Sequence, residues 1–258
     1  MSVNEPQRIT SRDNALLKDL RRLAQGNGEY RKQGRVWIEG DHLCSAALLR
    51  GWRPALAVFS ESYWPLAPAH IAQAATKNVV IDDALMKTIS DLPSPAPMAF
   101  LLDLPAAPTL DVQAPTVVLD RVQDAGNVGS MLRSAAAFGF TQIAALTGTA
   151  LLWSPKVLRA GMGAQFGLRL VEGLTADALA ALRVPLLVTS SHQGQWLHRA
   201  SLPWPCAWVL GHEGQGVQPA LAERAVLALR IAQPGGEESL NVAAAAAICL
   251  HASAVARA

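Results

Sequence analysis

The pattern that most limits the fold of this chain is the alternation of short apolar runs with helical periods after residue 115. Strands are predicted at 116–119, 142–145, 185–189, 207–210 and 226–231. Helices are predicted at 127–138, 155–161, 176–182 and from 239 onward. Strands and helices that alternate at this spacing favour a parallel, doubly wound α/β sheet. Ligands of such sheets bind beyond the carboxyl ends of the strands.

A shorter alternation occupies the first part of the chain. Helices are predicted at 8–25, 41–50, 68–75 and 83–90, with strands at 36–38, 55–59, 79–81 and 98–102. The stretch 103–115 is rich in proline and has no sustained period, which is typical of a linker. We therefore predict a small α/β domain over 1–102, a linker over 103–115 and a larger domain over 116–258.

Composition limits the class of protein. The chain has 258 residues, of which 51% are hydrophobic, so it can bury a large core. A net charge of +2 gives no overall field for nucleic acid. Residues 1–35 nevertheless carry eight Lys and Arg against four Asp and Glu. This arm can bind phosphates or form a solvated helix face.

The cysteines and the chain start point to the cytoplasm. Cys44, Cys206 and Cys249 are odd in number and far apart, which favours buried thiols over disulfides or a zinc site. Met1 is followed by polar residues and not by an apolar leader. The alanine-rich C-terminal run contains His251, so we expect a packed helix and no membrane span.

Two polar loops follow predicted strands of the larger domain. The first reads RVQDAGNVGSMLR, in which Asn127 can cap a helix, Gly129 allows close approach and Arg133 follows within the helix. The second reads VLGHEGQGV and contains Glu213 among three glycines. Neither matches a phosphate-binding P-loop or a dinucleotide fingerprint. An ordinary strand-to-helix turn and a tight turn are the simpler interpretations of these loops.

A third polar loop leads into the C-terminal helix, in the sequence IAQPGGEESLNVAAAAAICLHASAVA. Ser239 is predicted as the N-cap, with Glu237 and Glu238 where the helix dipole favours negative charge. The small residues allow close packing of the helix against a flat surface. Alone, the pattern fits a capped core helix as well as a ligand site.

Together, these three loops resemble the signature motifs of the SpoU (TrmH) family of RNA ribose methyltransferases, within the SPOUT superfamily. The first motif corresponds to Asn127-Val-Gly129 with Arg133, and the second to residues 210–216. The third corresponds to Ile231 with residues 239–242. The resemblance covers residues 116–256.

This resemblance implies a parallel α/β fold with a C-terminal trefoil knot, an exception to the rule that chains do not thread themselves. It implies a homodimer that binds S-adenosylmethionine in the knot, without a metal. The residues expected to bind the cofactor are Thr189, Leu210, Gly211, Gly214, Gly216, Ile231, Gln233, Ser239 and Leu240. The residues expected to serve the chemistry are Asn127, Arg133, Glu213, Ser239 and Asn241.

The implied reaction is methyl transfer to a ribose 2′-hydroxyl of RNA. Arg133 is expected to position a phosphate, because arginine stays protonated and is a poor base. Asn127 and Asn241 would orient the ribose and the loops, and Ser239 would hydrogen-bond near the reacting hydroxyl. Glu213 would fix Arg133 or the second loop.

The N-terminal sequence, with its Glu39-Gly40 corner, resembles the RNA-binding substrate domain of some family members. Ribosomal RNA is therefore the favoured substrate and transfer RNA the second. The alternatives are a non-catalytic RNA-binding relative and an enzyme acting on a small nucleotide. The chain departs from the family pattern at Gly161, where many relatives have serine, and at 232–236.

Histidines and tryptophans add little to the assignment. We expect His192, His198 and His212 to be loop or surface residues. The tryptophans could stack on bases, but core or interface packing is the simpler role for most of them. They lie at positions 37, 52, 64, 153, 196, 204 and 208.

Overall fold

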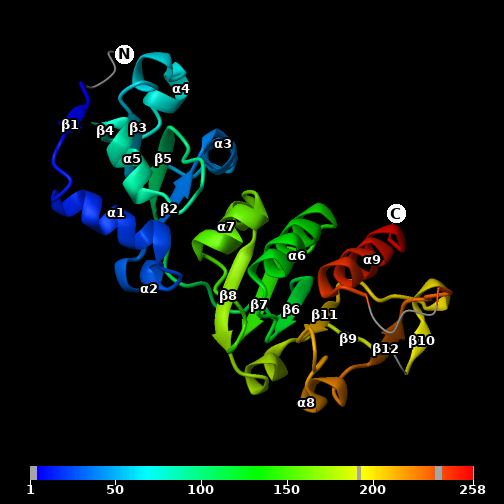
Figure 1. The fold of residues 1–258 in the computed structure, drawn as a ribbon. Coiled ribbons are helices and arrows are strands. Elements are labelled where there is room, and N and C mark those ends of the chain that lie inside the picture. The colour runs from blue at the N-terminus through cyan, green and yellow to red at the C-terminus, as the bar shows by residue number, and fades with distance from the viewer. Residues whose placement is uncertain (1–4, 191–192, 236–239, 258) are drawn as a thin grey trace. The chain divides into compact units, whose positions relative to one another are not determined.

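The computed structural model describes residues 5–190, 193–235 and 240–257 (Figure 1). The chain forms two compact units, Met1–Ala106 with Trp153–Phe166 and Ala107–Leu152 with Gly167–Ala258. The sequence prediction placed the segment 153–166 in the C-terminal domain, whereas its packing places it in the first unit. Within that unit the Trp52 ring packs against Trp153 and Phe166, and its Nε1 donates to the Phe166 carbonyl at 3.1 Å.

The first unit is built on a five-stranded mixed sheet in the order β1-β4-β3-β5-β2. Its strands are β1 (Gln7–Ile9), β2 (Arg35–Glu39), β3 (Leu56–Ser60), β4 (Asn78–Ile81) and β5 (Met98–Asp103). Its α-helices are α1 (Ala15–Gln25), α2 (Glu29–Gln33), α3 (Asp41–Leu49), α4 (Ala69–Ala72), α5 (Asp83–Ile89) and α7 (Pro155–Gly161). Strands β1, β4 and β3 are parallel, and β5 is antiparallel to both of its neighbours.

The helix predicted over residues 8–25 was wrong at its start. Residues 7–9 form β1, because Ile9 pairs with Ile81 of β4, and α1 begins only after Asn14. The Asn14 side chain caps this helix by accepting from the Leu16 N–H at 2.9 Å. Helix α2 lies between the predicted elements 8–25 and 36–38, where no helix was predicted. It ends at Gly34, whose φ of +65° favours glycine. The predicted corner at Gly40 is present, with φ of +88°.

The second unit contains a seven-stranded sheet in the order β10-β12-β9-β11-β6-β7-β8, and every pairing is parallel. Its strands are β6 (Thr116–Asp120), β7 (Gln142–Leu146), β8 (Arg169–Leu174), β9 (Leu186–Thr189), β10 (Gln195–Trp196), β11 (Ala207–Gly211) and β12 (Leu227–Arg230). Its α-helices are α6 (Ala125–Ala137), α8 (Pro219–Ala222) and α9 (Val242–Val255). The predicted parallel α/β fold is confirmed.

Three details of this unit differ from prediction. Strands β8 and β10 were not predicted, and 177–181 is a 3-10 helix where an α-helix was expected. Arg169 and Glu172 interrupt the apolar run of β8, and β10 has only two residues, so neither gives a clear strand pattern.

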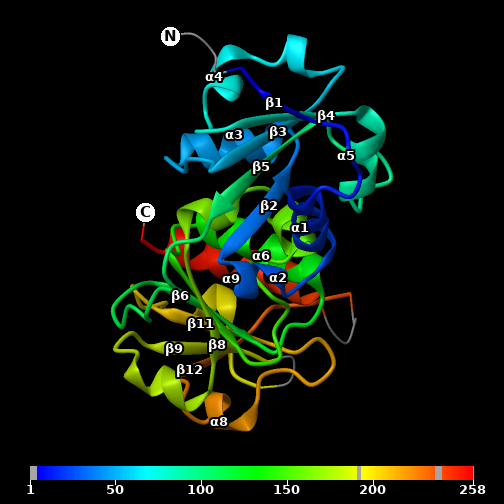
Figure 2. The same cartoon turned by 90° about the vertical axis from the view of Figure 1, so that its left-hand side faces the viewer.

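Helices α6 and α9 pack against each other and lie over the parallel sheet (Figures 1 and 2). Helix α9 is tied to β11 by Trp208, whose buried indole Nε1 donates to the Ser253 hydroxyl at 2.9 Å. In the ranges that the structure describes, none of the helices combines the length and apolar character needed to cross a membrane.

The order of strands sets the position of the polar loops. The chain runs from β6 to β7 and β8 on one side, then crosses to β9, and β11 inserts between β9 and β6. Because all strands are parallel, the carboxyl ends of β6, β11, β9 and β12 lie side by side. The second and third loops of the sequence therefore emerge next to the first.

Candidate active site

Several predicted cofactor residues lie where neighbouring strands end. Gly211, the last residue of β11, is in register with Asp120 of β6. Thr189, the last residue of β9, is in register with Leu229 of β12. The structure thus brings three polar loops together at one end of the sheet, as the sequence predicted.

The second motif folds as a closed hairpin. The backbones of His212 and Gly216 bond in both directions, with N–O distances of 3.1 and 2.8 Å. The His212 Nδ1 accepts from the N–H groups of Gly214 and Gln215 at 3.0 and 3.3 Å. Through these two contacts the His212 side chain stabilises the turn.

A glycine is needed at position 211 because the two arms of the hairpin approach each other closely there. A Cβ at this position would lie 2.2 Å from the carbonyl carbon of Gly216 and 2.2 Å from the Val217 nitrogen. Both atoms belong to the backbone, so a side chain cannot be accommodated by a rotamer change. Gly216 itself has φ of +67°, in the left-handed region that favours glycine.

A buried carboxylate anchors this hairpin. Asp120, fully buried at the end of β6, accepts from the Gln218 N–H at 2.7 Å and from the Gln218 Nε2 at 2.9 Å. It also pairs with Arg121 at 2.8 Å, and Arg121 reaches Gln215 of the hairpin at 2.8 Å. The hydrogen bond to Asp120 raises the pKa of Arg121.

This anchor was not predicted from the sequence. Arg121 adopts φ of +59°, which is uncommon for a residue with a side chain. The hydrogen bonds from its Nε to Asp120 and from its Nη1 to Gln215 hold it in this conformation. The only sequence signal was a carboxylate at the end of an apolar strand, followed directly by a basic residue.

A chain of side-chain hydrogen bonds joins all three motifs. The Glu213 carboxylate of the hairpin accepts from Asn127 Nδ2 at 3.2 Å. The Asn127 Oδ1 accepts from Asn241 Nδ2 at 3.0 Å. Glu213 also accepts from the backbone N–H groups of Asp124 and Gln123. Asn127, Glu213 and Asn241 are therefore brought together as predicted for one site.

The environment of Glu213 favours its ionised form. Burial raises the pKa of this carboxyl. The hydrogen bonds from its own backbone, from Asn127 and from the N–H groups of Asp124 and Gln123 outweigh burial, so the pKa is lowered below its ordinary value. Glu213 is thus an acceptor at neutral pH, which suits a residue that holds two loops together.

The caps of the two helices differ from prediction. Helix α6 is capped by Asp124, which accepts from the Asn127 N–H at 2.7 Å, and Asn127 is the third helical residue. Helix α9 is capped by Asn241, which accepts from the N–H groups of Ala243 and Ala244 at 2.9 and 3.2 Å. Ser239, predicted as this cap and as a site residue, lies outside the described residues, as do Glu237 and Glu238.

Arg133 lies on α6 and is exposed. It follows Asn127 by six residues, roughly 9 Å along the helix axis. Within the described ranges Arg133 forms no ion pair, and Glu213 contacts Asn127 instead. Its exposed guanidinium is available to an anionic ligand.

The remaining predicted cofactor residues support a ligand at this end of the sheet. The Oε1 of Gln233 is buried and has no hydrogen-bond partner among the described residues. A buried polar atom without a partner is rare and marks a place where a ligand or water completes the bonding. Ile231 is half-buried, Leu240 is 38% exposed, and Leu210 is buried in β11. Ile231 and Leu240 expose apolar surface and Gln233 carries polar atoms, a mixture that suits a nucleoside, whereas the Leu210 side chain is enclosed in the core.

Gly161, where the sequence departs from many relatives, makes room for another side chain. A Cβ on this buried residue of α7 would lie 2.5 Å from the Gln165 amide atoms. The Gln165 amide is buried and donates to the Val157 carbonyl at 2.9 Å. The glycine therefore belongs to the packing of α7 in the first unit.

The cysteines are not candidates for the chemistry. All three are free and buried, as predicted. Burial raises the pKa of Cys206 to about 11 and that of Cys249 to about 12, and it also raises the pKa of Cys44. A thiol that stays protonated at neutral pH is a poor nucleophile.

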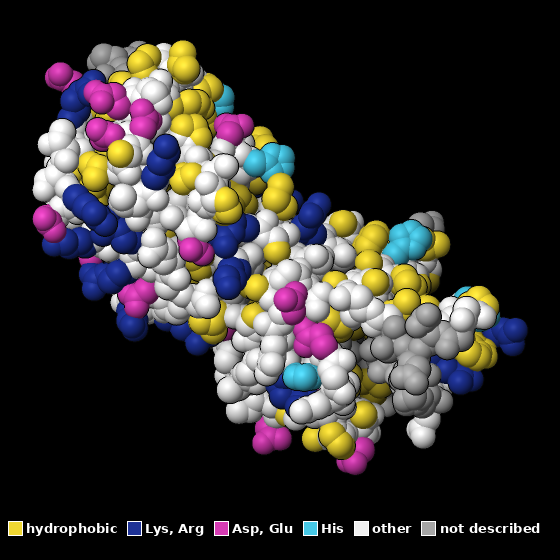
Figure 3. Space-filling model, viewed as in Figure 1, with side chains coloured by type: hydrophobic (Ala, Val, Ile, Leu, Met, Phe, Trp, Pro, Cys, Tyr) yellow, Lys and Arg dark blue, Asp and Glu magenta, His cyan; other side chains and the backbone are white. Residues whose placement is uncertain are grey.

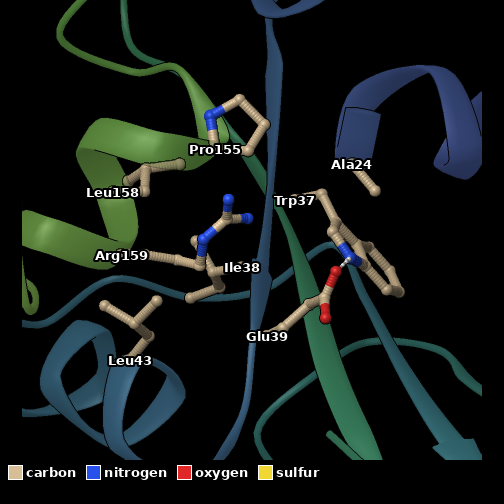
Figure 4. A pocket seen from close by; sticks show the side chains of 8 residues that line it. All are labelled: Ala24, Trp37, Ile38, Glu39, Leu43, Pro155, Leu158 and Arg159. Atoms are coloured by element: carbon tan, nitrogen blue, oxygen red, sulfur yellow. Dashed lines mark hydrogen bonds between the residues drawn. The ribbon is translucent and has the colours of Figure 1, made fainter. Parts of the chain in front are cut away.

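The first unit contains a small pocket of its own (Figure 4). It is lined by Ala24, Trp37, Ile38, Glu39, Leu43, Pro155, Leu158 and Arg159. The Glu39 carboxylate is already bonded, since it accepts from Trp37 Nε1 at 2.8 Å and from the Ser90 hydroxyl at 2.5 Å. Because the Glu39 carboxylate is bonded within the unit, we assign this pocket to the packing of α7 on β2 and not to a ligand.

A family model supplies the decisive comparison. The model of the SpoU rRNA Methylase family matches residues 114–251, a range that contains all three motifs. The chain belongs to this family. The resemblance that was predicted from the three motifs is thereby confirmed.

Relatives of the SpoU family match almost the whole chain. It is 30% identical over 249 residues to the 23S rRNA (guanosine(2553)-2′-O)-methyltransferase of Bacillus subtilis, covering 95% of this chain and 98% of that protein. It is 31% identical over 259 residues to an uncharacterized tRNA/rRNA methyltransferase of Synechocystis sp., covering 94% and 92%. The structure of an AdoMet-bound rRNA methyltransferase from Sinorhizobium meliloti superposes with a TM-score of 0.83 at 26% identity, covering 96% and 97%.

Proposed function

We propose that this protein transfers a methyl group from S-adenosylmethionine to a ribose 2′-hydroxyl of RNA. The observation that carries the proposal is the hydrogen-bonded chain Glu213–Asn127–Asn241, which joins the three SpoU motifs at the carboxyl ends of parallel strands. Relatives that match over nearly their full length are named as RNA methyltransferases, and one solved relative is bound to AdoMet.

The cofactor would be held where β9, β11 and β12 end. The residues proposed to hold it are Thr189, Leu210, Gly211, Gly214, Gly216, Ile231, Gln233, Ser239 and Leu240. The tight hairpin at Gly211 and the unpartnered Gln233 oxygen fit a ligand that is bound largely by backbone and amide groups. When bound, S-adenosylmethionine supplies an electrophilic methyl group. We include in the proposal the trefoil knot that the family resemblance implies for this part of the chain.

The protein groups would act by positioning the RNA. Because a guanidinium is a poor base and binds phosphate well, the role proposed for Arg133 is to bind a phosphate near the target ribose and not to remove a proton. Asn127 and Asn241 would hold the ribose and the helix ends, and Glu213 would keep the hairpin against the first loop. Ser239 is proposed to bond near the reacting hydroxyl. Alignment of the ribose oxygen with the methyl group is the contribution to the rate that such positioning residues make.

Ribosomal RNA is the proposed substrate, with transfer RNA second, because the matched family and the Bacillus subtilis relative are named for ribosomal RNA. We further propose that the protein acts as a homodimer in the cytoplasm. The N-terminal domain, over residues 1–102, is proposed to bind the RNA.

The chemistry of the product provides the test. Purified protein is incubated with unmodified ribosomal RNA and S-adenosylmethionine labelled in the methyl group, and the RNA is then hydrolysed with alkali. A 2′-O-methyl group protects the adjoining phosphodiester bond, so the label is expected in alkali-resistant dinucleotides. Label in mononucleotides alone would indicate methylation of a base and contradict the proposal. The variant Arg133→Ala is expected to lose most of the transfer while retaining cofactor binding.

A further inference from the structure

An arginine and a tryptophan stack on each other beside the predicted cofactor loops. The Cζ of Arg230 lies 3.8 Å from the centroid of the Trp196 ring. The two residues are in register on the parallel strands β12 and β10, and each is the last residue of its strand. They therefore lie at the same end of the sheet as the three motifs, and Arg230 directly precedes Ile231 of the third.

Two further side chains extend this surface. The His198 ring is inclined by 29° to the Trp196 ring, with centroids 6.3 Å apart. His198 and Arg199 are exposed, whereas Trp196 is half-buried. Figure 3 shows Lys and Arg side chains next to hydrophobic ones at the end of this unit where β10 lies. We call these four residues, Trp196, His198, Arg199 and Arg230, the stacking platform.

The charge of the platform is not neutralised within the described parts of the chain. Arg230 and Arg199 form no ion pair there, and the Nε of Arg230 is buried without a hydrogen-bond partner. Unlike Nε, the two terminal nitrogens of the Arg230 guanidinium are not among the buried atoms, so they are left for an acceptor outside the protein. Phosphate is the acceptor that a guanidinium binds best.

We propose that the stacking platform binds an unpaired nucleotide of the RNA substrate next to the ribose that is methylated. Aromatic rings and guanidinium planes stack on splayed bases, and adjacent arginines bind the flanking phosphates. The platform thus gives the second unit its own contact with single-stranded RNA. This inference rests on the proposed function, since it places the platform beside the site of methyl transfer.

A second arginine–tryptophan pair in the same unit provides a matched control. The Cζ of Arg257 lies 4.3 Å from the centroid of Trp204. Trp204 precedes the amino end of β11, so this pair lies at the opposite end of the strands from the three motifs. Changes at Arg257 alter the same kind of contact but leave the proposed RNA surface intact.

The test measures the affinity of the full-length protein for a fluorescently labelled single-stranded oligoadenylate. Trp196→Ala and His198→Ala are each compared with wild type, with Trp196→Phe as the variant that keeps an aromatic ring. Loss of the Trp196 ring is expected to raise the Kd about tenfold, the effect of removing one base–aromatic stack. Trp196→Phe retains most of the affinity, and Arg257→Ala leaves it unchanged.

The salt dependence and the cofactor affinity complete the test. Arg199→Ala, a change of an exposed side chain, lowers the slope of log Kd against log salt by about 0.7, as expected for the loss of one phosphate contact to a single strand. S-adenosylmethionine affinity is expected to be the same in all these variants. If platform variants bind oligoadenylate as tightly as wild type, or if wild-type protein methylates RNA without binding this probe, the platform is only a packing contact. Wild-type protein that neither binds S-adenosylmethionine nor methylates RNA would instead contradict the proposed function.

Discussion

The two ends of the parallel strands both carry buried polar side chains, but these side chains have different partners. At the amino ends, the buried Gln142 amide bonds to the Asp111 backbone in both directions and to the Thr116 hydroxyl, and this network is closed. At the carboxyl ends, the buried Asp120 is bonded through Arg121 to an exposed hairpin. A closed buried network specifies the fold, whereas one that continues into loops also positions them for a ligand.

Because the hairpin at the carboxyl ends is proposed to hold the cofactor, we expect the largest loss of methyl transfer from a substitution at Gly211. A Cβ at this position meets the hairpin backbone, so Gly211→Ala forces the two arms apart by more than a side-chain adjustment. We expect methyl transfer to fall about hundredfold, the effect of misplacing a binding loop by about 1 Å. Initial rates with labelled S-adenosylmethionine measure the loss. Gly214→Ala, whose Cβ meets the His212 ring only at 3.9 Å, is the control for folding of the same hairpin and should keep the wild-type unfolding temperature.

Asp120 and Gln142 test the comparison directly. Asp120→Ala leaves Arg121 and Gln218 without the carboxylate that accepts from them. Gln142→Ala leaves the Asp111 N–H without its acceptor and the Thr116 hydroxyl without the donor from Gln142. Each change is expected to lower the free energy of unfolding by about 2 kcal/mol. Only Asp120→Ala should also weaken S-adenosylmethionine binding, because only that network reaches the hairpin. Denaturant unfolding measures the stability of both variants, and titration with S-adenosylmethionine measures their cofactor affinity. Weaker cofactor binding by Gln142→Ala would contradict the claim that only the network at the carboxyl ends of the strands positions the hairpin.

Asn241 combines a cap with a link to Asn127, and two substitutions separate these roles. Asn241→Ala loses both, at a cost of about 1 kcal/mol in the free energy of unfolding for the cap. Asn241→Asp keeps the oxygen that accepts from Ala243 and Ala244 but loses the N–H donated to Asn127. We expect the aspartate variant to unfold like wild type and to transfer methyl groups more slowly. If Asn241→Asp transferred methyl groups at the wild-type rate, the hydrogen bond between Asn241 and Asn127 would have no role in the reaction.

The smallest expected effect is a pH dependence of the free energy of unfolding that comes from Glu213. Its folded-state pKa is lowered, so ionised Glu213 contributes stability above the ordinary glutamate pKa of about 4.3 and loses this contribution as the pH falls below that value. Glu213→Gln lacks this contribution at every pH. The difference in unfolding free energy between wild type and Glu213→Gln should therefore shrink on acidification from pH 7. A difference that grows toward low pH would mean that the folded state favours the protonated carboxyl.

The sequence was sufficient to predict the fold class, most strands of both sheets and the approach of Asn127, Glu213 and Asn241. Buried parallel strands are apolar throughout and easy to recognise, and the three motifs directly follow them. The helix caps could not be chosen from sequence, because Asp124, Asn127, Ser239 and Asn241 all have side chains suited to capping. Tertiary contacts decide which of them does so.

The anchor at Asp120 and the stacking platform lay beyond sequence reasoning for another reason. Asp120 and Gln218 are 98 positions apart, and their contact depends on β11 inserting beside β6. Trp196 and Arg230 meet only because the two-residue strand β10 pairs with β12. Neither pairing has a local pattern, so both contacts appear only when the order of strands is known.

The central claim is that the loops at the carboxyl ends of β9, β11 and β12 bind S-adenosylmethionine. Calorimetric titration of the folded protein with S-adenosylmethionine, in the absence and presence of ribosomal RNA, tests it most directly. We predict saturable binding to wild type that is strongly weakened by Gly211→Ala and unchanged in Gln142→Ala. Absence of binding to folded wild-type protein under both conditions would contradict the claim.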